Sequence, residues 1–352
     1  MSITLPAQRI GVVGSGSWGT AITGLIATQA KQVVVWSYER DVARGINEHH
    51  RNPHQLTDYV LSDRVIATTS LEELAEGTEA VVLAVPSAFL RGVCAQLAPY
   101  LDQDVPVLIL SKGVERNTGC LMADVVEQEL GNGQRIAVLS GPNHAEEISK
   151  GTISAAVVAS QNDEVSSYFQ KLLVCPAFRV YVTDDVRGVE VCAAAKNVIA
   201  LACGVAVALG AGDNTLAALM TRGLAEISRL AKACGGDPLT CMGLAGMGDL
   251  VVTCTSRHSR NRTFGEAFVA GEPLQAYERR TGMVVEGAEA AVSLFELAQR
   301  KGVEAPITKA VYQILYDGLP LAEAIDALLG RLPHDEFYGV VPGARPGSNV
   351  AG

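Results

Sequence analysis

The feature that most constrains the fold is a glycine-rich loop near the N-terminus, Gly14-Ser15-Gly16-Ser17-Trp18-Gly19. An apolar run typical of a β-strand precedes it, and small and apolar residues typical of a helix follow it. In this context the Gly-x-Gly-x-x-Gly spacing indicates a loop that binds the pyrophosphate of a dinucleotide. The first glycine permits a tight turn, the second lets the backbone approach the pyrophosphate, and the third lets the helix pack on the strand. The chain is therefore predicted to begin with a dinucleotide-binding domain.

Short β-branched runs alternate with helical patterns from residue 9 to about residue 183. The candidate strands are residues 10–13, 33–36, 65–68, 80–85, 105–110, 136–139, 155–159 and 179–182. This alternation predicts an α/β fold with a doubly wound, mostly parallel sheet of the Rossmann type.

After Asp184 the strand pattern stops, and the remaining periodic segments are helical. They cover residues 186–209, 215–233, 262–270, 286–300, 306–316 and 321–329. We therefore predict a dinucleotide-binding domain over residues 1–185 and an all-α substrate domain over residues 186–338. Residues 339–352 are rich in glycine and proline, and a flexible tail is expected there.

Charge and composition exclude several classes of function. The net charge of −10 argues against nucleic-acid binding and requires that an anionic ligand be met by a local cationic patch. The eight cysteines form no C-x-x-C pair, which favours reduced core residues in a cytoplasmic protein. The most apolar stretch is interrupted by Glu190, Lys196 and Asn197, so no membrane span is expected. His49, His50 and His54 lack the acidic neighbours of a metal site, and no metal is predicted.

The end of the second predicted strand bears on the choice of cofactor. It reads Trp36-Ser37-Tyr38-Glu39-Arg40, where NAD enzymes carry an acidic residue for the ribose 2′-hydroxyl. Glu39 could bind that hydroxyl and Arg40 could accept a 2′-phosphate, or both could be solvated loop charges. The cofactor is therefore expected to be NAD or NADP.

Three further strand ends carry unusual residues, namely Val85-Pro86-Ser87, Ser111-Lys112-Gly113 and Ser140-Gly141-Pro142. Ligands of open parallel sheets bind outside the carboxyl ends of the strands. We expect these turns to line one crevice with the Gly14 loop, although Lys112 could also be a solvated loop residue.

Lys196 lies in the middle of a segment, residues 192–200, that is apolar on nearly every helical face and is therefore expected to be buried. A buried lysine is costly without partners, and burial lowers the pKa of a lysine toward the range useful for proton transfer. Alternatively, Lys196 could extend its ammonium to the surface. Asp249 belongs to a predicted glycine-rich turn, Gly246-Met247-Gly248-Asp249, and could pair with Lys196 or cap the following segment. His144 and His258 are alternative proton carriers.

The segment from Thr255 to Arg262 holds three arginines within six residues of an acidic chain. Ser259 is a predicted N-cap, with Arg260 and Asn261 opening a helix. Hydroxyl, guanidinium, amide and helix N-terminus together favour a phosphate-binding cradle. The alternative is a basic surface turn.

Together these motifs resemble the bacterial NAD(P)-dependent glycerol-3-phosphate dehydrogenase family over residues 9–336. The matching stretches are GSGSWG at Gly14, LSKGVE at Leu110, SGP at Ser140, AAAKNVIA at Ala193, TRGLAEISRL at Thr221, GLAGMGDLVVTCTSRHSRNRTFG at Gly243, VVEG at Val284 and LLGR at Leu328. The resemblance implies reversible reduction of dihydroxyacetone phosphate to sn-glycerol 3-phosphate, which feeds phospholipid synthesis. It also implies a cytoplasmic enzyme and a homodimer.

The resemblance also implies roles for individual residues. Lys196 would be the general acid and base, with Lys112 and Asp249 completing the catalytic set. The implied cofactor contacts are Gly14, Gly16, Ser17, Trp18, Gly19, Tyr38, Lys112, Ala145, Arg260 and Glu286. The implied substrate contacts are Lys112, Gly141, Asn143, Lys196, Asp249, Ser259, Arg260 and Asn261. One departure is the run from Gly141 to Glu147, GPNHAEE, where the family reads Gly-Pro-Thr-Phe-Ala-Lys-Glu.

Two rival functions use the same features. Another two-domain dehydrogenase, acting on a β-hydroxyacid or ketopantoate, would share the Gly14 loop but would have no use for a phosphate cradle at Arg260. A protein that senses NAD(P) without turnover would gain no obvious benefit from a buried Lys196.

Overall fold

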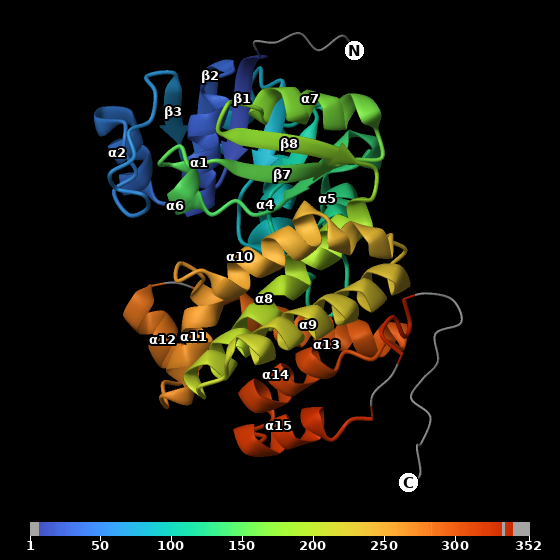
Figure 1. The fold of residues 1–352 in the computed structure, drawn as a ribbon. Helices are drawn as coiled ribbons and strands as arrows, with labels where there is room; N and C mark the ends of the chain where they lie inside the picture. The colour runs from blue at the N-terminus through green and yellow to red at the C-terminus, as the bar shows by residue number, and fades with distance from the viewer. Residues whose placement is uncertain (1–6, 283, 333–334, 341–352) are drawn as a thin grey trace. The chain divides into compact units, whose positions relative to one another are not determined.

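The computed structural model describes residues 7–282, 284–332 and 335–340. The chain divides into two compact units (Figure 1). The first comprises Met1–Glu115 and Cys120–Val186, and the second comprises Arg116–Gly119 and Arg187–Gly352. The short segment Arg116–Gly119 thus belongs to the second unit although it interrupts the first in sequence.

The first unit is built on an eight-stranded sheet. Its strands are β1 (Ala7–Val13), β2 (Ala30–Trp36), β3 (Val65–Thr68), β4 (Ala80–Leu83), β5 (Val107–Ile109), β6 (Ile136–Ser140), β7 (Ser154–Ala159) and β8 (Phe178–Thr183). Their order is β3-β2-β1-β4-β5-β6-β7-β8, and every neighbouring pair is parallel except β6 and β7. The prediction of a doubly wound, mostly parallel sheet is confirmed.

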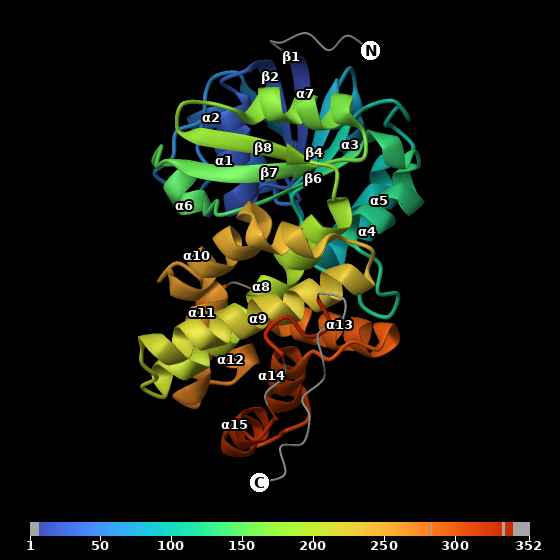
Figure 2. The same ribbon diagram turned by 45° about the vertical axis from the view of Figure 1, so that its right-hand side comes forward.

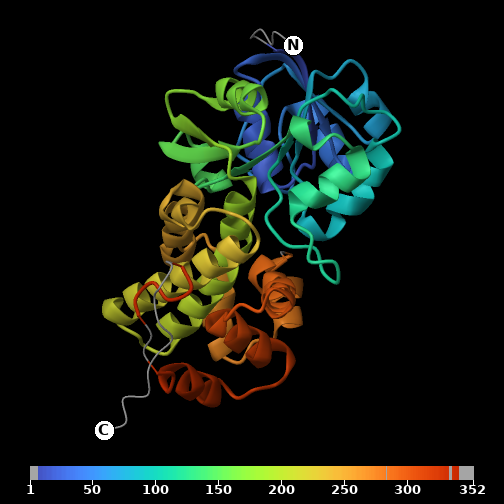
Figure 3. The same ribbon diagram turned by 90° about the vertical axis from the view of Figure 1, so that its right-hand side faces the viewer.

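Helices cover both faces of this sheet, which explains why its central strands are apolar on both sides. They are α1 (Ser17–Ile26), α2 (Arg40–His49), α3 (Leu71–Ala75), α4 (Ser87–Leu97), α5 (Met122–Leu130), α6 (Ala145–Ile148) and α7 (Asp163–Leu173). Figures 2 and 3 show α7 on one face and α4 and α5 on the other. Because neighbouring strands from β2 to β6 are parallel, their carboxyl ends lie along one edge of the sheet. The predicted cofactor residues follow the strands at this edge.

The second unit is helical throughout its described part. Its helices are α8 (Val186–Ala208, whose first residue still belongs to the first unit), α9 (Asp213–Ala233), α10 (Asp249–Thr255), α11 (Arg260–Val269), α12 (Leu274–Thr281), α13 (Glu286–Lys301), α14 (Pro306–Tyr316) and α15 (Leu321–Leu329). By length and composition alone α8 could cross a membrane, but most of it is buried inside the protein. The all-α prediction for this part is confirmed.

Close backbone packing fixes α11 against α8. A Cβ atom on Gly204 would lie 2.0 Å from the carbonyl oxygen of Arg262, and one on Gly265 would lie 2.3 Å from that of Leu201. Only glycine fits at these two positions, so the helix that begins at Arg260 is held directly against the helix that carries Lys196.

Several sequence expectations differ from the structure. The predicted turn at 246–249 is a π-helical turn, Leu244–Gly248, that continues into α10, and α12 was not expected. Two of the eight cysteines, Cys120 and Cys175, are only half-buried, because both lie in loops rather than in the core. Most of the predicted tail, from residue 341 on, lies outside the described residues.

Candidate active site

The Gly14 loop has the backbone geometry that its sequence predicts. Gly14 has φ of 112°, and a Cβ atom there would lie 2.6 Å from the carbonyl oxygen of Ala84. A Cβ on Gly19 would lie 2.1 Å from the carbonyl oxygen of Gly14, whereas one on Gly16 would meet nothing within 4 Å. Gly14 and Gly19 are thus required by the chain itself, while Gly16 borders open space at the N-terminus of α1.

The end of β2 lies beside this loop. The buried hydroxyl of Ser37 is 2.7 Å from the hydroxyl of Ser15, which ties the two strand ends together. Tyr38 is 82% exposed, and Glu39 and Arg40 are exposed as well. The three residues that follow Ser37 are therefore accessible to a nucleotide.

The remaining strand ends of the first unit are also joined. The Ser111 hydroxyl donates to the carbonyl oxygen of Val85 at 2.5 Å, which ties the end of β5 to that of β4. Lys112, the next residue, is half-buried.

The turn after β6 requires glycine at position 141. Gly141 has φ of 147°, and a Cβ there would lie 2.8 Å from the carbonyl oxygen of Ala155. The sequence motif at 140–142 therefore has a backbone role besides any contact with a ligand.

Two buried N–H groups at this edge lack acceptors in the described part of the chain. They are the Asn143 Nδ2 and the Trp18 Nε1. Asn143 is followed closely by the buried Ala145, the first residue of α6. Buried donors are nearly always bonded in folded proteins, so a ligand that accepts hydrogen bonds would complete this environment.

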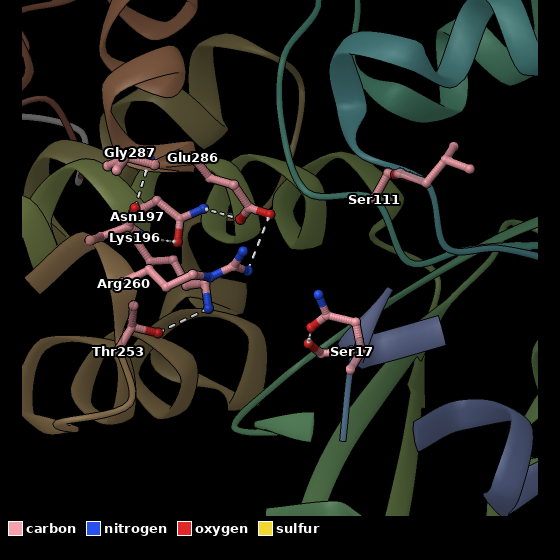
Figure 4. Close-up of polar contacts among 12 residues, drawn as sticks. Ser17, Ser111, Lys196, Asn197, Thr253, Arg260, Glu286 and Gly287 are labelled. Atoms are coloured by element: carbon pink, nitrogen blue, oxygen red, sulfur yellow. Dashed lines mark hydrogen bonds and ion pairs between the residues drawn. The ribbon is translucent and has the colours of Figure 1, made fainter. Parts of the chain in front are cut away.

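In the second unit, Lys196 is buried in the middle of α8 with a relative exposure of 6%. Its Nζ donates to Asp249 Oδ1 and, at 2.9 Å, to Thr253 Oγ1 (Figure 4). The pairing with Asp249 that the sequence left open is thus present, and Lys196 does not extend to the surface. Thr253 was missed by sequence reasoning, although it lies four residues after Asp249 and so on the same face of α10.

The basic segment contains arginines in three different environments. The Arg262 guanidinium bonds the Thr255 carbonyl and pairs with Glu266 at 3.0 Å, so it holds the fold together. Arg257 is exposed. The Arg260 side chain is 48% exposed and lies 3.8 Å from Glu286, a long contact for an ion pair. Of the two arginines within α11, Arg260 and Arg262, it is therefore Arg260 that is able to turn toward an anion in front of the helix.

Local backbone structure supports the predicted helix start at this point. The Ser259 hydroxyl accepts from the Arg262 backbone N–H at 3.3 Å, as an N-cap does. Within the described residues, the backbone N–H groups of Arg260 and Asn261 have no recorded acceptor. These donors and the positive end of the helix dipole favour an anion in front of α11.

The Asn261 side chain is already engaged. It donates to Asn197 Oδ1 at 2.9 Å and accepts from the Gly287 backbone N–H at 2.8 Å (Figure 4). Asn197 in turn approaches Glu286 Oε2 at 3.4 Å. This network joins α8, α11 and the start of α13. Asn197, which sequence reasoning did not select, is the residue next to Lys196 in the same buried helix.

No group of three or more His, Cys, Asp or Glu side chains in the described residues could hold a metal ion. Of the three clustered histidines, His54 pairs with Asp41 at 2.6 Å. Of the two alternative proton carriers, His144 is half-buried in the first unit and His258 is exposed in the second.

Comparison with known proteins identifies close relatives over nearly the whole chain. Residues 9–166 match the family described as NAD-dependent glycerol-3-phosphate dehydrogenase N-terminus, and residues 185–326 match its C-terminus. A glycerol-3-phosphate dehydrogenase [NAD(P)+] of Thermobifida fusca is 45% identical over 94% of this chain and 99% of its own length. One of Shouchella clausii is 41% identical over 94% and 98%. The crystal structure of the Coxiella burnetii glycerol-3-phosphate dehydrogenase has a TM-score of 0.87 and 35% identity, covering 93% of this chain and 100% of that one.

Proposed function

The chain belongs to the NAD-dependent glycerol-3-phosphate dehydrogenase family, and on that premise we propose how its residues carry out the reaction. The activity is the reversible, NAD(P)H-dependent reduction of dihydroxyacetone phosphate to sn-glycerol 3-phosphate. Its product feeds glycerophospholipid synthesis. The assignment of residues to the cofactor, the phosphate and the proton is the part that we propose.

The cofactor residues are proposed to be those at the carboxyl edge of the sheet in the first unit. They fit a dinucleotide, because Gly16 leaves open space at the N-terminus of α1 and the Trp18 and Asn143 donors lack acceptors there. Tyr38, exposed after β2, would lie against the adenosine, and Ala145 and Lys112 would border the nicotinamide. When bound, the reduced nicotinamide supplies the hydride.

The substrate phosphate is proposed to bind at the start of α11. The Arg260 guanidinium and the backbone N–H groups of Arg260 and Asn261 would donate to it, and the Ser259 hydroxyl can donate while it caps the helix. Asn261 would act partly through Asn197 and Gly287, because these hold its amide in one orientation. Arg260 and Glu286 are also proposed as cofactor contacts, as the family resemblance implies.

Lys196 is proposed to donate a proton to the C2 oxygen of the ketone and to remove it in the reverse reaction. Asp249 holds the ammonium by an ion pair and Thr253 by a hydrogen bond at 2.9 Å, which fixes the direction of the Nζ. Lys112 and Gly141 would orient the carbonyl end of the substrate.

The observation that carries this proposal is the buried Lys196–Asp249 pair in the helical unit that also carries Arg260. The test measures turnover of dihydroxyacetone phosphate and of unphosphorylated dihydroxyacetone, each with NADH and NADPH. Arg260→Ala should raise the KM for the phosphorylated substrate roughly 10- to 100-fold, the effect of losing a charge-assisted hydrogen bond. The matched control is Arg257→Ala, an exposed arginine of the same segment that lies outside α11, which should leave KM unchanged. Equal turnover of the two ketones would contradict the phosphate assignment.

The rival dehydrogenases share only the fold. A 2-dehydropantoate 2-reductase from Geobacter metallireducens has a TM-score of 0.57 at 15% identity. We further propose that the enzyme is a cytoplasmic homodimer, as the family resemblance implies. Light scattering of the purified protein tests the dimer.

A further inference from the structure

A turn after α2 is bonded directly to the phosphate-binding loop. The Asn52 side chain is fully buried, and its Nδ2 donates to the Ser15 carbonyl oxygen at 2.7 Å and to the Thr20 hydroxyl at 3.0 Å. Its Oδ1 accepts from the backbone N–H groups of His54 and Gln55 at 2.9 and 3.0 Å. Two of the four hydrogen bonds of this buried amide therefore join the turn to a segment more than thirty residues away, and the other two are local to the turn.

The same turn brings a second amide to the N-terminus of α1. Gln55 is half-buried, and its Oε1 accepts from the Ser17 hydroxyl at 2.5 Å. Figure 4 labels Ser17 and marks its hydrogen bond with a dashed line. Ser17 is the first residue of α1 and follows Gly16, which borders open space. No group in the described part of the chain accepts a hydrogen bond from the Gln55 Nε2.

We propose that Gln55 is a further ligand of the cofactor pyrophosphate and that Asn52 is the residue that positions it together with the phosphate loop. This inference rests on the proposed function, since it requires a dinucleotide at the N-terminus of α1. Phosphate oxygens only accept hydrogen bonds. On binding, the Ser17 hydroxyl turns to donate to a phosphate oxygen, and Gln55 Nε2 donates to the same group.

The hydrogen bonds separate this role from one in folding. The four bonds of Asn52 already anchor the turn, so the Gln55 side chain is not needed to hold it. The Gln55 side chain is half-buried, and while its oxygen accepts from the Ser17 hydroxyl its Nε2 remains able to donate to a ligand. A neutral amide also suits this place, because it adds a donor without the cost of burying a charge.

The test compares Gln55→Glu, Gln55→Ala and the control Gln161→Glu. Gln161 is exposed in the same unit and undergoes the same change of charge. The affinity for NADH and NADPH is measured by the fluorescence of the reduced nicotinamide, together with the thermal midpoint. Gln55→Glu should weaken both cofactors about tenfold or more, because a carboxylate would face the pyrophosphate, and added salt should reduce the loss. Gln55→Ala should weaken them about threefold to tenfold, and Gln161→Glu should have no effect.

The outcomes are distinguishable. If wild-type protein binds neither nucleotide, the proposed function fails. If wild type binds and Gln55→Glu binds within twofold of it, the inference about Gln55 is overturned while the proposed function stands. A loss of affinity that appears only with a lowered thermal midpoint would also overturn it, since the role would then be structural.

Asn52→Asp tests the positioning role, because aspartate keeps the shape and the acceptors but cannot donate to Ser15 and Thr20. We expect the dissociation constants of the cofactors to rise about tenfold or more, with kcat at saturating cofactor close to wild type. Wild-type affinity in the folded variant would overturn the role of Asn52. If the variant does not fold, the Gln55 series decides the proposal.

Discussion

The buried Lys196–Asp249 pair permits a test that separates chemistry from stability. The two side chains are 8% and 2% exposed, so replacing either one alone leaves a charge buried without its partner. Such changes cost about 3–5 kcal/mol of folding stability. Replacing both by apolar residues of similar volume is often neutral or stabilising. The variants are therefore Lys196→Met, Asp249→Leu and the double variant.

Thr253 can bond whichever member of the pair remains in a single variant. In Asp249→Leu, Lys196 Nζ keeps its hydrogen bond to Thr253 Oγ1 at 2.9 Å, which contributes about 1 kcal/mol. In Lys196→Met, the Asp249 carboxylate can likewise accept from the Thr253 hydroxyl, which lies 3.4 Å from its Oδ1, so the two single variants should lose similar amounts of stability. Added together, the single effects amount to about 6–10 kcal/mol, whereas the double variant should lie near wild type. The coupling energy should thus be several kcal/mol.

Activity should not follow stability. Each variant that lacks Lys196 should lose roughly 10²- to 10⁴-fold in kcat, and the double variant should stay inactive although its stability recovers. Stability is measured by denaturant unfolding, and turnover by the absorbance of the reduced nicotinamide with dihydroxyacetone phosphate. Cofactor affinity serves as the control and should be unchanged. If the double variant regained turnover along with stability, the pair would be structural and another group would carry the proton.

Three further predictions concern the loop, a helix cap and the cofactor preference. Gly19→Ala should destabilise the protein, because its Cβ would lie 2.1 Å from the Gly14 carbonyl oxygen. In Gly16→Ala the new Cβ meets nothing within 4 Å. This variant should keep the thermal midpoint of wild type and weaken NADPH binding about tenfold or more. Burial raises the pKa of Glu226, which accepts from the first turn of α14, so the folded state takes up a proton at higher pH than the unfolded state. Stability measured by denaturant should therefore fall as pH rises from the ordinary carboxyl value of 4.5 to the raised one, and Glu226→Gln should lack this slope. Arg40→Ala should lower the ratio of NADPH to NADH use in steady-state assays, and an unchanged ratio would remove Arg40 from the 2′-phosphate site.

The fold was predictable where local signals agree with the tertiary structure. The bounds of α14 and α15 match the prediction because proline marks each start, at Pro306 within the first turn and at Pro320 just before the helix. The helix α12 was missed because it offers no apolar stripe, and Tyr277 is its one buried residue. The π-helical turn at 244–248 was predicted only as a glycine-rich turn at 246–249, because glycine has a low intrinsic helix propensity.

The site was only partly predictable. Lys196 could be selected because a charge in an apolar helix is conspicuous in sequence. Thr253 could not, because its bond to Lys196 spans 57 residues and a threonine in a helix is unremarkable. Arg260 and Arg262 look equivalent in sequence, yet the Arg262 guanidinium is already bonded to the Thr255 carbonyl oxygen and paired with Glu266. Which polar groups are already bonded depends on tertiary contacts, and that is the information the sequence lacks.

The net charge of −10 makes these local arrangements necessary. A dinucleotide and a phosphorylated ketone are both anions, and the overall field of the protein repels them. At physiological ionic strength that field is screened beyond about 8 Å, so binding depends on donors in direct contact with the phosphates. In the proposed sites the chain supplies them at the N-termini of α1 and α11, each with a polar side chain nearby, Gln55 and Arg260 respectively. On this reasoning the two proposed phosphate-binding sites would follow the same construction, and would differ because the pyrophosphate would meet a neutral amide while the monoester phosphate would meet a guanidinium.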